Sequence, residues 1–451
     1  MELTCFTRFS LGQPLGQMRA VPVRNGDTGA VLLVYAGDYD VDPWHEMFFY
    51  PTDTLKLTLV SRDGKVLWTH DLGRGVPPGM WFCPVLPFDL DGDGVEEIWV
   101  VGNEDTQHPL SQRHRVLMRL NPETGTVTGT WKWLTKSPNQ TISHAYRNFL
   151  IGGYVNGKPV LVTAQGTYGD MFLQGWNAGM EPRWETAIAK DSAGARGSHM
   201  CPVVDINGDG TDELFWGERC LSLNDGAELF CADADTYRGH SDIIQPVLCP
   251  DGQWRIYTCR ESEGDVSPRV VTFDAEGSRL WGDLEQGHMD MGWVARIGDN
   301  QEFIATAIRI SQKQSGPGGH IHSNREEFAW DIQTGEARTL PFTSYQTLPV
   351  DLNGDGYHEL VRGLYQGDGT VWDRTGRTWG SVGGSVALAG KFMDRPGEQL
   401  VVFQPDGTVS FWGDNRAEDT PEASARYAHP FYANSLRLMA SGYNKIVLGG
   451  I

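Results

Sequence analysis

A long apolar run, a secretion signal and an excess of positive charge are all missing from this sequence of 451 residues. No segment approaches the roughly 18 consecutive apolar residues of a membrane span. Residues 1–9 have neither the basic start nor the apolar core of a signal peptide. These absences predict a soluble chain with no membrane partner. We expect it in the cytoplasm, or outside the cell if a signal peptide has been removed.

Basic residues are too few for a protein that binds nucleic acid. The chain has 37 Lys and Arg against 58 Asp and Glu, which gives a formal net charge of −21. Such a surface repels a polyanion, so we expect no nucleic-acid partner. Part of the negative charge belongs to three acidic repeats, where a bound cation would neutralise it.

Cysteines are also scarce and irregularly spaced. The seven cysteines are scattered, and most stand inside apolar runs. An odd, irregular set does not form the disulfide framework of a small secreted protein. We therefore expect reduced thiols in a core, which agrees with a cytoplasmic location.

Three copies of one acidic, glycine-containing motif are the clearest feature that is present. Each copy has oxygen-bearing side chains at alternate positions, glycines for a tight turn and a closing Glu, which suits calcium with its about 6–8 oxygen ligands. The copies lie between β-type runs rather than between the helices of an EF-hand. We predict structural calcium in turns between strands. The predicted ligands are Asp89, Asp91, Asp93 and Glu97; Asp205, Asn207, Asp209 and Glu213; and Asp351, Asn353, Asp355 and Glu359.

Composition and internal repeats predict an all-β propeller. With 55 Gly, 16 Trp and no long stretch of helical periodicity, the chain is typical of short strands joined by turns. Similar units recur about every 45 residues, the spacing of four-stranded blades. Residues 1–451 are predicted to form a single eight-bladed β-propeller domain, with seven blades as the alternative. Pairing of the N- and C-terminal strands would close the ring, and residues 427–451 would complete a blade.

Four histidines stand at equivalent positions, where successive inner strands begin. In a propeller these positions converge around the central axis on one face, while the calcium turns leave the opposite end of the strands. Two aromatic residues at matching positions of other units are suited to contact a sugar ring. We interpret the cluster as a functional site, with a repeat-derived structural role as the alternative. The histidines are His144, His199, His240 and His288, and the aromatic residues are Trp81 and Tyr345.

Arginines accompany the histidines in this acidic chain. A planar guanidinium pairs with a carboxylate through two hydrogen bonds, so arginines gathered on one face indicate a carboxylate-bearing ligand. The arginines beside the histidines are Arg147, Arg196 and Arg238, and those that close second strands are Arg260, Arg309 and Arg362.

The segment from Arg196 to Glu213, followed by Gly-His-Ser-Asp at residues 239–242, resembles a known family. So does Gly-Thr-Tyr-Gly at residues 166–169, which leads to Pro-Arg-Trp at 182–184. The family is that of calcium-stabilised eight-bladed propeller polysaccharide lyases typified by rhamnogalacturonan lyases, with related propeller enzymes that act on rhamnose–uronate linkages. The sequence lacks the paired histidines of ulvan-type lyases.

The resemblance implies β-elimination at a uronic acid within an acidic, rhamnose-containing oligosaccharide. This reaction needs a clamp for the carboxylate, a base for the C5 proton and help for the departing glycosidic oxygen. Arg196 and Arg238 are the candidate clamp. His199 and His240 are the candidate base and acid. Tyr168 or Tyr237 would supply a second proton-transfer group.

Three alternatives remain at the level of sequence. The histidines could instead hold a divalent transition metal such as Mn, Fe, Ni or Zn, as in the cytoplasmic oligogalacturonate lyases that this arrangement resembles. A rhamnosidase-like glycoside hydrolase would use two carboxylates, for which Asp242 and Asp290 are candidates. A non-catalytic carbohydrate-binding propeller would need only the aromatic and arginine side chains.

Overall fold

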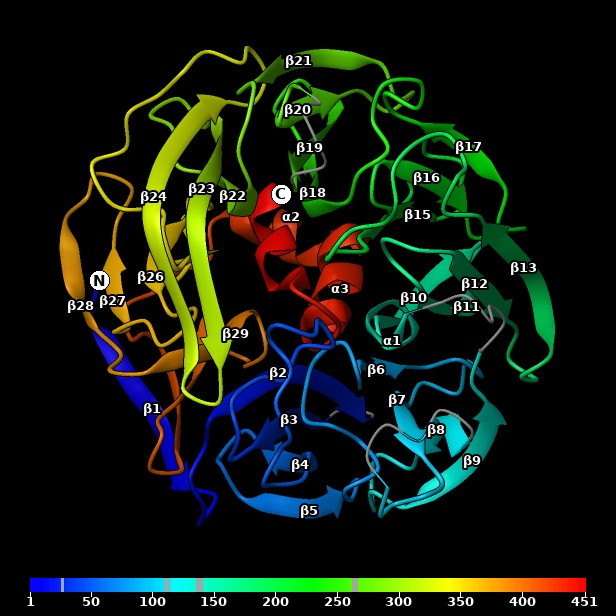
Figure 1. Ribbon diagram of the computed structural model, residues 1–451. Coiled ribbons are helices and arrows are strands. Elements are labelled where there is room, and N and C mark those ends of the chain that lie inside the picture. Colours follow the sequence, from blue (N-terminus) through cyan, green and yellow to red (C-terminus); the bar gives the residue numbers. More distant parts are fainter. Residues whose placement is uncertain (26–27, 109–110, 112–113, 135–140, 262–266) are drawn as a thin grey trace.

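The computed structural model describes residues 1–25, 28–108, 111, 114–134, 141–261 and 267–451. Within them, the strands form eight antiparallel sheets, of which seven have four strands and one has three. The sheets stand in a ring around a central axis (Figure 1). The predicted all-β class is confirmed.

The sheets follow one another around the ring in chain order. The first four consist of β2 (Gln17–Asn25), β3 (Thr28–Ala36), β4 (Lys56–Ser61) and β5 (Val66–Asp71); β6 (Val85–Phe88), β7 (Glu97–Asn103), β8 (Arg115–Leu120) and β9 (Val127–Lys132); β10 (Asn148–Val155), β11 (Lys158–Gln165), β12 (Met171–Trp176) and β13 (Pro182–Ile188); and β14 (Val203–Val204), β15 (Glu213–Trp216), β16 (Arg219–Ser222) and β17 (Glu228–Cys231). The others consist of β18 (Ser241–Leu248), β19 (Trp254–Arg260), β20 (Val270–Phe273) and β21 (Arg279–Asp283); β22 (Met289–Arg296), β23 (Phe303–Gly316) and β24 (Gly319–Asp331); β25 (Thr347–Val350), β26 (Glu359–Arg362), β27 (Thr370–Trp372) and β28 (Thr378–Ser381); and β29 (Ser385–Gly390), β30 (Gln399–Phe403), β31 (Thr408–Asp414) and β1 (Leu3–Ser10).

Burial falls from the axis to the rim because inner strands are covered on both faces. All four residues of β6 are buried, whereas the outer strand β9 is mostly exposed. This gradient explains why the inner strands read as apolar runs and the outer strands alternate.

Neighbouring sheets are joined at the rim by a recurring contact between a tryptophan and a glycine turn. Trp68 on β5 donates its indole N–H to the carbonyl of Pro122 at 2.8 Å. Its ring covers Gly125, whose φ is +67° and where a Cβ would lie 2.5 Å from the indole. Trp184 covers Gly226 in the same way. Only glycine suits both the turn and the close approach.

The first strand of the chain lies beside the last. β1 pairs antiparallel with β31, from Leu3 opposite Asp414 to Ser10 opposite Thr408. The expectation that residues 427–451 add a strand is wrong, because they are helical and lie at the centre of the ring (Figure 1).

The local sequence explains why the C-terminal segment is helical. It contains α2 (Pro421–Ala428), α3 (Pro430–Arg437) and the 3₁₀ turns η2 (Leu438–Ala440) and η3 (Asn444–Gly450). Thr420 and His429 cap the two α-helices with their side chains, and a proline follows each cap. Buried apolar residues of η3, such as Val447 and Leu448, belong to the main core. The segment therefore fills the central channel.

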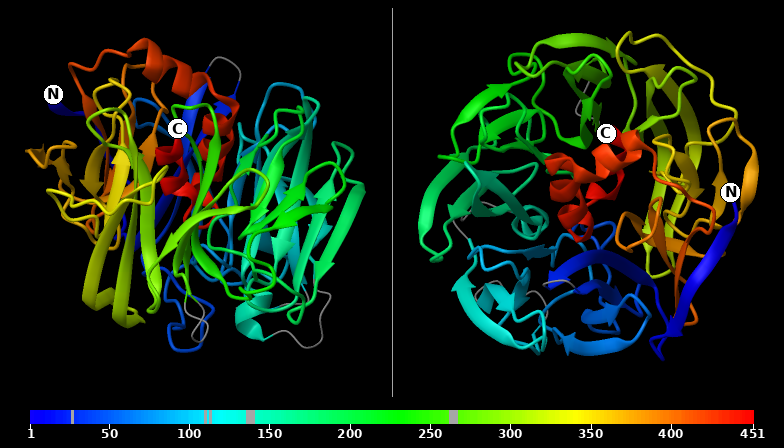
Figure 2. Two further views of the ribbon diagram at one scale, coloured as in Figure 1. Left: turned by 90° about the horizontal axis from the view of Figure 1, so that it is seen from above. Right: turned by 180° about the vertical axis from the view of Figure 1, so that it is seen from behind.

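The two ends of the ring differ. A side view places α2 at one end and the short helix α1 (Ile142–Ala145) at the other (Figure 2). None of the helices among the described residues is long and apolar enough to cross a membrane.

Candidate active site

A cavity of about 750 Å³ opens at the end of the ring that carries α1. Its wall combines residues that precede inner strands with residues from five other places: the loop after β3, the turn between β11 and β12, the end of β19, the long strand β23 and the turn before η3. Inner strands begin at this end, so the side chains just before them converge here, as predicted.

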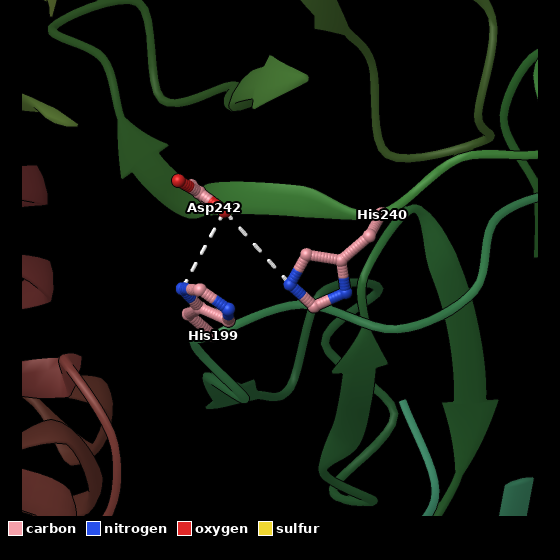
Figure 3. Close-up of side chains that lie close together, drawn as sticks. All are labelled: His199, His240 and Asp242. Atoms are coloured by element: carbon pink, nitrogen blue, oxygen red, sulfur yellow. Dashed lines mark ion pairs between the residues drawn. The ribbon is translucent and has the colours of Figure 1, made fainter. Parts of the chain in front are cut away.

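Two histidines and an aspartate form the floor beside this cavity. His199 precedes β14, His240 immediately precedes β18, and Asp242 is the second residue of β18. The Nδ1 atom of His199 and the Nε2 atom of His240 lie 3.4 and 3.9 Å from Oδ1 of Asp242 (Figure 3). All three side chains are almost fully buried.

Tyr168 connects this floor to the cavity. Its hydroxyl oxygen lies 3.1 Å from Nε2 of His199, and its ring stacks on His240 with 4.0 Å between centroids. The residue has a φ of +73°, in a turn between β11 and β12. A non-glycine residue in this region carries backbone strain, which is common at functional sites.

Burial sets the protonation of these groups. It lowers the pKa of His199 and of His240 well below the usual value, with help from the positive charge of Arg147. It also raises the pKa of Tyr168 well above its usual value, assisted by Glu261. At neutral pH the two imidazoles are therefore uncharged and the phenol keeps its proton.

The two aspartates next to this site have opposite pKa shifts. Burial, together with Glu261 and Asp290, raises the pKa of Asp242 well above its usual range. Burial alone would also raise that of Asp290, but Lys313 and His288 hold it well below. Nζ of Lys313 lies 3.1 Å from Oδ1 of Asp290. Asp290 is therefore ionised, and Lys313 and His288 stabilise its negative charge.

Several buried polar atoms of the floor have no hydrogen-bond partner. They are Nε2 of His240 and both carboxylate oxygens of Asp242. Unpaired buried polar atoms are costly, so their presence points to a missing ligand. Potential metal-binding atoms of His199, His240 and Asp242 lie within 4.8 Å of one another, as do those of Asp242, Glu261 and His288.

Two cationic side chains face the cavity. Arg147 precedes β10; its Nη2 donates to Oδ1 of Asp42 at 3.2 Å, and its guanidinium lies 5.0 Å from the Tyr168 ring centroid. Its Nε and Nη1 atoms are buried without a partner. Lys313 reaches the cavity from β23, and Asp290 and Asp242 raise its pKa although burial opposes the charge. Both side chains are therefore charged and placed to bind an anion.

The structure brings most of the predicted histidine face together. His144 on α1 and His288 before β22 line the cavity with His199, Tyr168 and Arg147. Nε2 of His288 lies 3.6 Å from Glu261 and 3.5 Å from Asp290, and these carboxylates raise its pKa against the effect of burial. His144 belongs to neither group of potential metal-binding atoms within the described residues.

Tyr237 and Arg260 do not face the cavity, and their predicted roles require correction. The Tyr237 hydroxyl donates to the backbone oxygen of His240 at 2.5 Å, and the ring is fully buried. Arg260 pairs with Glu218 and Asp233, each at 2.6 Å. Tyr237 holds the backbone of His240, and Arg260 pairs with Ser241, the first residue of the strand that follows it.

The two aromatic residues predicted to contact sugar are also buried. Trp81 is 1% exposed and donates its indole N–H to Asp42 at 3.1 Å. Tyr345 is 5% exposed and pairs with Nδ1 of His322 at 3.1 Å. Side chains so covered cannot offer a face to a sugar ring, so this prediction was wrong.

The two arginines predicted to clamp the carboxylate, Arg196 and Arg238, do not line the cavity. Arg238 is exposed, and neither it nor Arg196 is among the described residues that line the cavity. Arg196 contributes its backbone oxygen, which accepts from the Tyr168 N–H at 3.1 Å and lies 3.4 Å from Nδ1 of His240. The cations that reach the cavity are Arg147 and Lys313.

Several residues at the cavity were missed from the sequence, and four of them contact the residues described above: Asp42, Glu261, Lys313 and Tyr443. Tyr443 comes from the C-terminal segment, and its ring centroid lies 5.4 Å from that of His199. Its backbone N–H donates to the His199 carbonyl at 3.3 Å. None of the four belongs to a repeated motif, which is the only signal that was available.

The three predicted calcium loops are not equivalent. In all three, the opening residues Asp89, Asp205 and Asp351 accept hydrogen bonds from backbone N–H groups of their own loops. The third is different, because Nη1 of Arg426 on α2 lies 3.2 Å from Oδ2 of Asp351. Tyr427 also donates to Asp351, at 3.0 Å. A positive charge from the protein thus occupies one side of the third loop.

Comparison with known proteins gives a consistent result. No protein-family model matches the chain. It is 28% identical over 383 residues to rhamnogalacturonan exolyase YesX of Bacillus subtilis (strain 168), and 25% identical over 366 residues to rhamnogalacturonan endolyase YesW of the same strain. These matches cover 77% and 66% of this chain, but 58% of each relative.

Solved structures of rhamnogalacturonan lyases share the fold. YesW has a TM-score of 0.75 at 16% identity, with 97% of this chain and 79% of that chain covered. YesX has a TM-score of 0.73 at 18% identity, with 97% and 80% covered. The Bacillus licheniformis lyase PL11 has a TM-score of 0.74 at 17% identity, with 98% and 81% covered. The predicted resemblance to rhamnogalacturonan lyases is confirmed.

Proposed function

We propose that this protein is a polysaccharide lyase with an eight-bladed propeller, which cleaves a rhamnose–uronate chain by β-elimination. The observation that carries the proposal is the cavity itself, where the buried Arg147 and the solvent-accessible Lys313 face an uncharged histidine hydrogen-bonded to a protonated tyrosine. The sequence similarity to two rhamnogalacturonan lyases supports this reaction and this substrate class. It does not favour the hydrolase alternative.

Arg147 and Lys313 are the proposed clamp for the uronate carboxylate. Arg147 is fixed by Asp42 and retains two buried donors without a partner. A carboxylate that accepts from these donors loses part of its negative charge, which makes the adjacent C5 proton more acidic. The clamp thereby lowers the barrier to carbanion formation.

His199 and Tyr168 are the proposed proton-transfer pair. A His199 tautomer with its proton on Nδ1, toward Asp242, leaves Nε2 with a lone pair for the C5 proton. Tyr168 donates its phenol proton to the departing glycosidic oxygen. The imidazolium then returns a proton to the tyrosinate along the 3.1 Å contact between Nε2 and the phenol oxygen. The proton lost from C5 is thus balanced by the one gained by the leaving group.

The proposed divalent-cation site consists of Asp242, Glu261 and His288, which leaves His199 available as the base, or of His199, His240 and Asp242, in which case a metal-bound His199 would not be the base. Imidazole nitrogens and carboxylate oxygens suit Mn, Fe, Ni or Zn, and the unpaired buried atoms of His240 and Asp242 fit such an ion. When bound, the ion would supply positive charge next to the uronate carboxylate. Calcium in the Asp89 and Asp205 loops, on the end opposite the cavity, is proposed as a structural ion.

An elimination assay tests the proposal. The purified protein is incubated with rhamnogalacturonan, rhamnose–glucuronate and oligogalacturonate fragments, with and without chelator, and the ultraviolet absorbance of the unsaturated uronate is followed. We expect activity on rhamnogalacturonan that His199→Ala abolishes and that the matched variant His114→Ala, at an exposed histidine that lines neither the cavity nor the apolar pocket beside it, retains. Release of reducing sugar without this absorbance would show hydrolysis, and binding without either signal would show a non-catalytic propeller.

A further inference from the structure

A second hollow, of about 370 Å³, lies at the end of the ring opposite the cavity, where α2 is found (Figure 2). It forms where the inner strands β2 and β29 end, and the last turn of α3 closes one side of it. Its volume is at the lower end of the range of ordinary ligand pockets. We call this hollow the rear pocket.

Basic side chains outnumber acidic ones in the lining of the rear pocket. The cations are Arg24, Arg62, Lys391 and Arg437, and the carboxylates are Glu96 and Asp394. This local excess of positive charge stands out in a chain whose formal net charge is −21. The rear pocket therefore attracts an anion.

Two of the four cations already have carboxylate partners. Nε of Arg437 donates to Oε1 of Glu96 at 3.1 Å, and Nζ of Lys391 donates to Asp419 at 2.8 Å. Within the part of the chain that the structure describes, the side chains of Arg24 and Arg62 make no hydrogen bond or ion pair. These two guanidinium groups remain available to a ligand.

Arg62 is held in the wall of the rear pocket. Its guanidinium lies over Gly29, the second residue of β3, and a Cβ at Gly29 would collide with Nη2 of Arg62. Its Nε atom is buried and has no partner among the described residues. A buried donor that is left unpaired is costly, so this atom points to a ligand that accepts from it.

The remaining lining favours an organic, hydroxylated anion over an inorganic one. The half-buried Pro22 and Met393 offer C–H surface to a ring, and the exposed carboxylate of Asp394 can accept from hydroxyl groups. The C-terminal turn of α3 also faces the rear pocket, and its partial negative charge disfavours a dianion such as phosphate. A sugar ring with one carboxylate fits all of these features.

We propose that the rear pocket is a second, non-catalytic binding site for a uronic acid. Arg62 and Arg24 bind its carboxylate, because a planar guanidinium pairs with a carboxylate through two hydrogen bonds. Asp394 accepts from the ring hydroxyls. The inference goes beyond the proposed function, because it places an acidic sugar at the end of the ring away from His199 and Tyr168. It is argued from the rear pocket alone and does not depend on the reaction in the cavity.

Binding of simple glycosides tests the rear pocket without any reaction. The probes are the methyl glycoside of D-galacturonic acid and its neutral counterpart, the methyl glycoside of D-galactose, titrated by saturation-transfer NMR. Every titration uses a chain that carries Arg147→Gln, so that the proposed clamp of the cavity is removed. We expect the galacturonoside to bind about tenfold or more tightly than the galactoside, because only the former has a carboxylate.

The added double substitution Arg24→Gln, Arg62→Gln should weaken galacturonoside binding about tenfold or more, because it removes both available guanidinium groups. The matched control is Arg8→Gln, Arg74→Gln. It removes the same two charges at exposed arginines that line neither the cavity nor the rear pocket, and it should bind as before. Melting curves check that both variants are folded.

Equal binding of the two glycosides, or galacturonoside binding that survives the Arg24 and Arg62 substitutions, would overturn the proposal. Inorganic phosphate that displaces the galacturonoside at a lower concentration than the galacturonoside needs to bind would also overturn it, in favour of an inorganic-anion site.

The elimination assay separates this site from the proposed reaction. In the chain with Arg147 intact, Arg24→Gln, Arg62→Gln should leave kcat/KM on short fragments unchanged, and a loss of tenfold or more would contradict a separate site. A chain that binds the galacturonoside through Arg24 and Arg62 but forms no unsaturated product would keep the rear pocket and refute the reaction.

Discussion

Replacement of Arg426 by methionine should destabilise the fold strongly. The guanidinium pairs with Asp351 at 3.2 Å and with Glu398 at 2.5 Å, and the exposed fractions of the three side chains are 4%, 0% and 2%. Methionine keeps much of the volume but leaves two carboxylates in the core without their cation. Removal of one partner from such a buried pair costs about 3–5 kcal/mol. We expect a loss of this size in the free energy of unfolding at pH 7.

The loss should shrink at acid pH. Burial raises the pKa of Asp351 to about 6 even though Arg426 lowers it. Without Arg426 this pKa rises further, so Asp351 takes up a proton as the pH falls and its uncompensated charge disappears. The destabilisation should therefore be smaller at about pH 5 than at pH 7.

Urea unfolding in chelator, followed by tryptophan fluorescence, measures both effects. The control is the triple variant Arg426→Met, Asp351→Asn, Glu398→Gln, which removes the stranded charges and should recover much of the stability. A loss below about 1 kcal/mol would show that the pair behaves like an exposed one. A triple variant as unstable as the single one would show that packing, and not charge, is responsible.

Three further predictions concern the site and its ions. Activity should persist below pH 6.5 on the acid side and should not fall on the basic side until well above pH 10, because the pKa of His199 is lowered and that of Tyr168 is raised; a kcat/KM profile that is half-maximal at pH 6.5 or above on its acid side would contradict a buried, neutral His199. Arg147→Lys should reduce kcat/KM about tenfold or more, since a lysine cannot reproduce the planar fork; activity equal to that of the unaltered chain would remove Arg147 from the clamp. Asp242→Asn should lower the content of bound transition metal, measured by plasma mass spectrometry, and leave bound calcium unchanged. Metal content that is unaffected by this change would refute the cation site.

The sequence predicted the backbone well because the backbone repeats. Apolar runs at regular spacing identified the inner strands, and acidic motifs marked where three of them end. The histidines before β10, β14, β18 and β22 were found in the same way. The repeats identify equivalent positions in successive sheets. A residue type that recurs where the inner strands begin can therefore be recognised from the sequence.

The remaining features depend on contacts that do not repeat. Arg260 and Arg147 look alike in sequence, but Glu218 pairs with the first at 2.6 Å and keeps it away from the cavity. Lys313 reaches the cavity because β23 and β24 extend into a long hairpin of 14 and 13 residues. The C-terminal helices do have a local sequence signal, because the capping residues Thr420 and His429 are each followed by proline. This signal belongs to no repeat, so the strand periodicity does not reveal it.

The position of the C-terminal segment also orders events during synthesis. The first strand, β1, has its hydrogen-bonding partner in β31, and Tyr443 enters the cavity only after every sheet has been translated. At the usual rate of about 5–20 residues per second, β1 waits for on the order of tens of seconds before β31 emerges. A chain released early would carry an unpaired strand edge and an open channel, and its cavity would lack one wall. Completion of the cavity is therefore tied to completion of the chain.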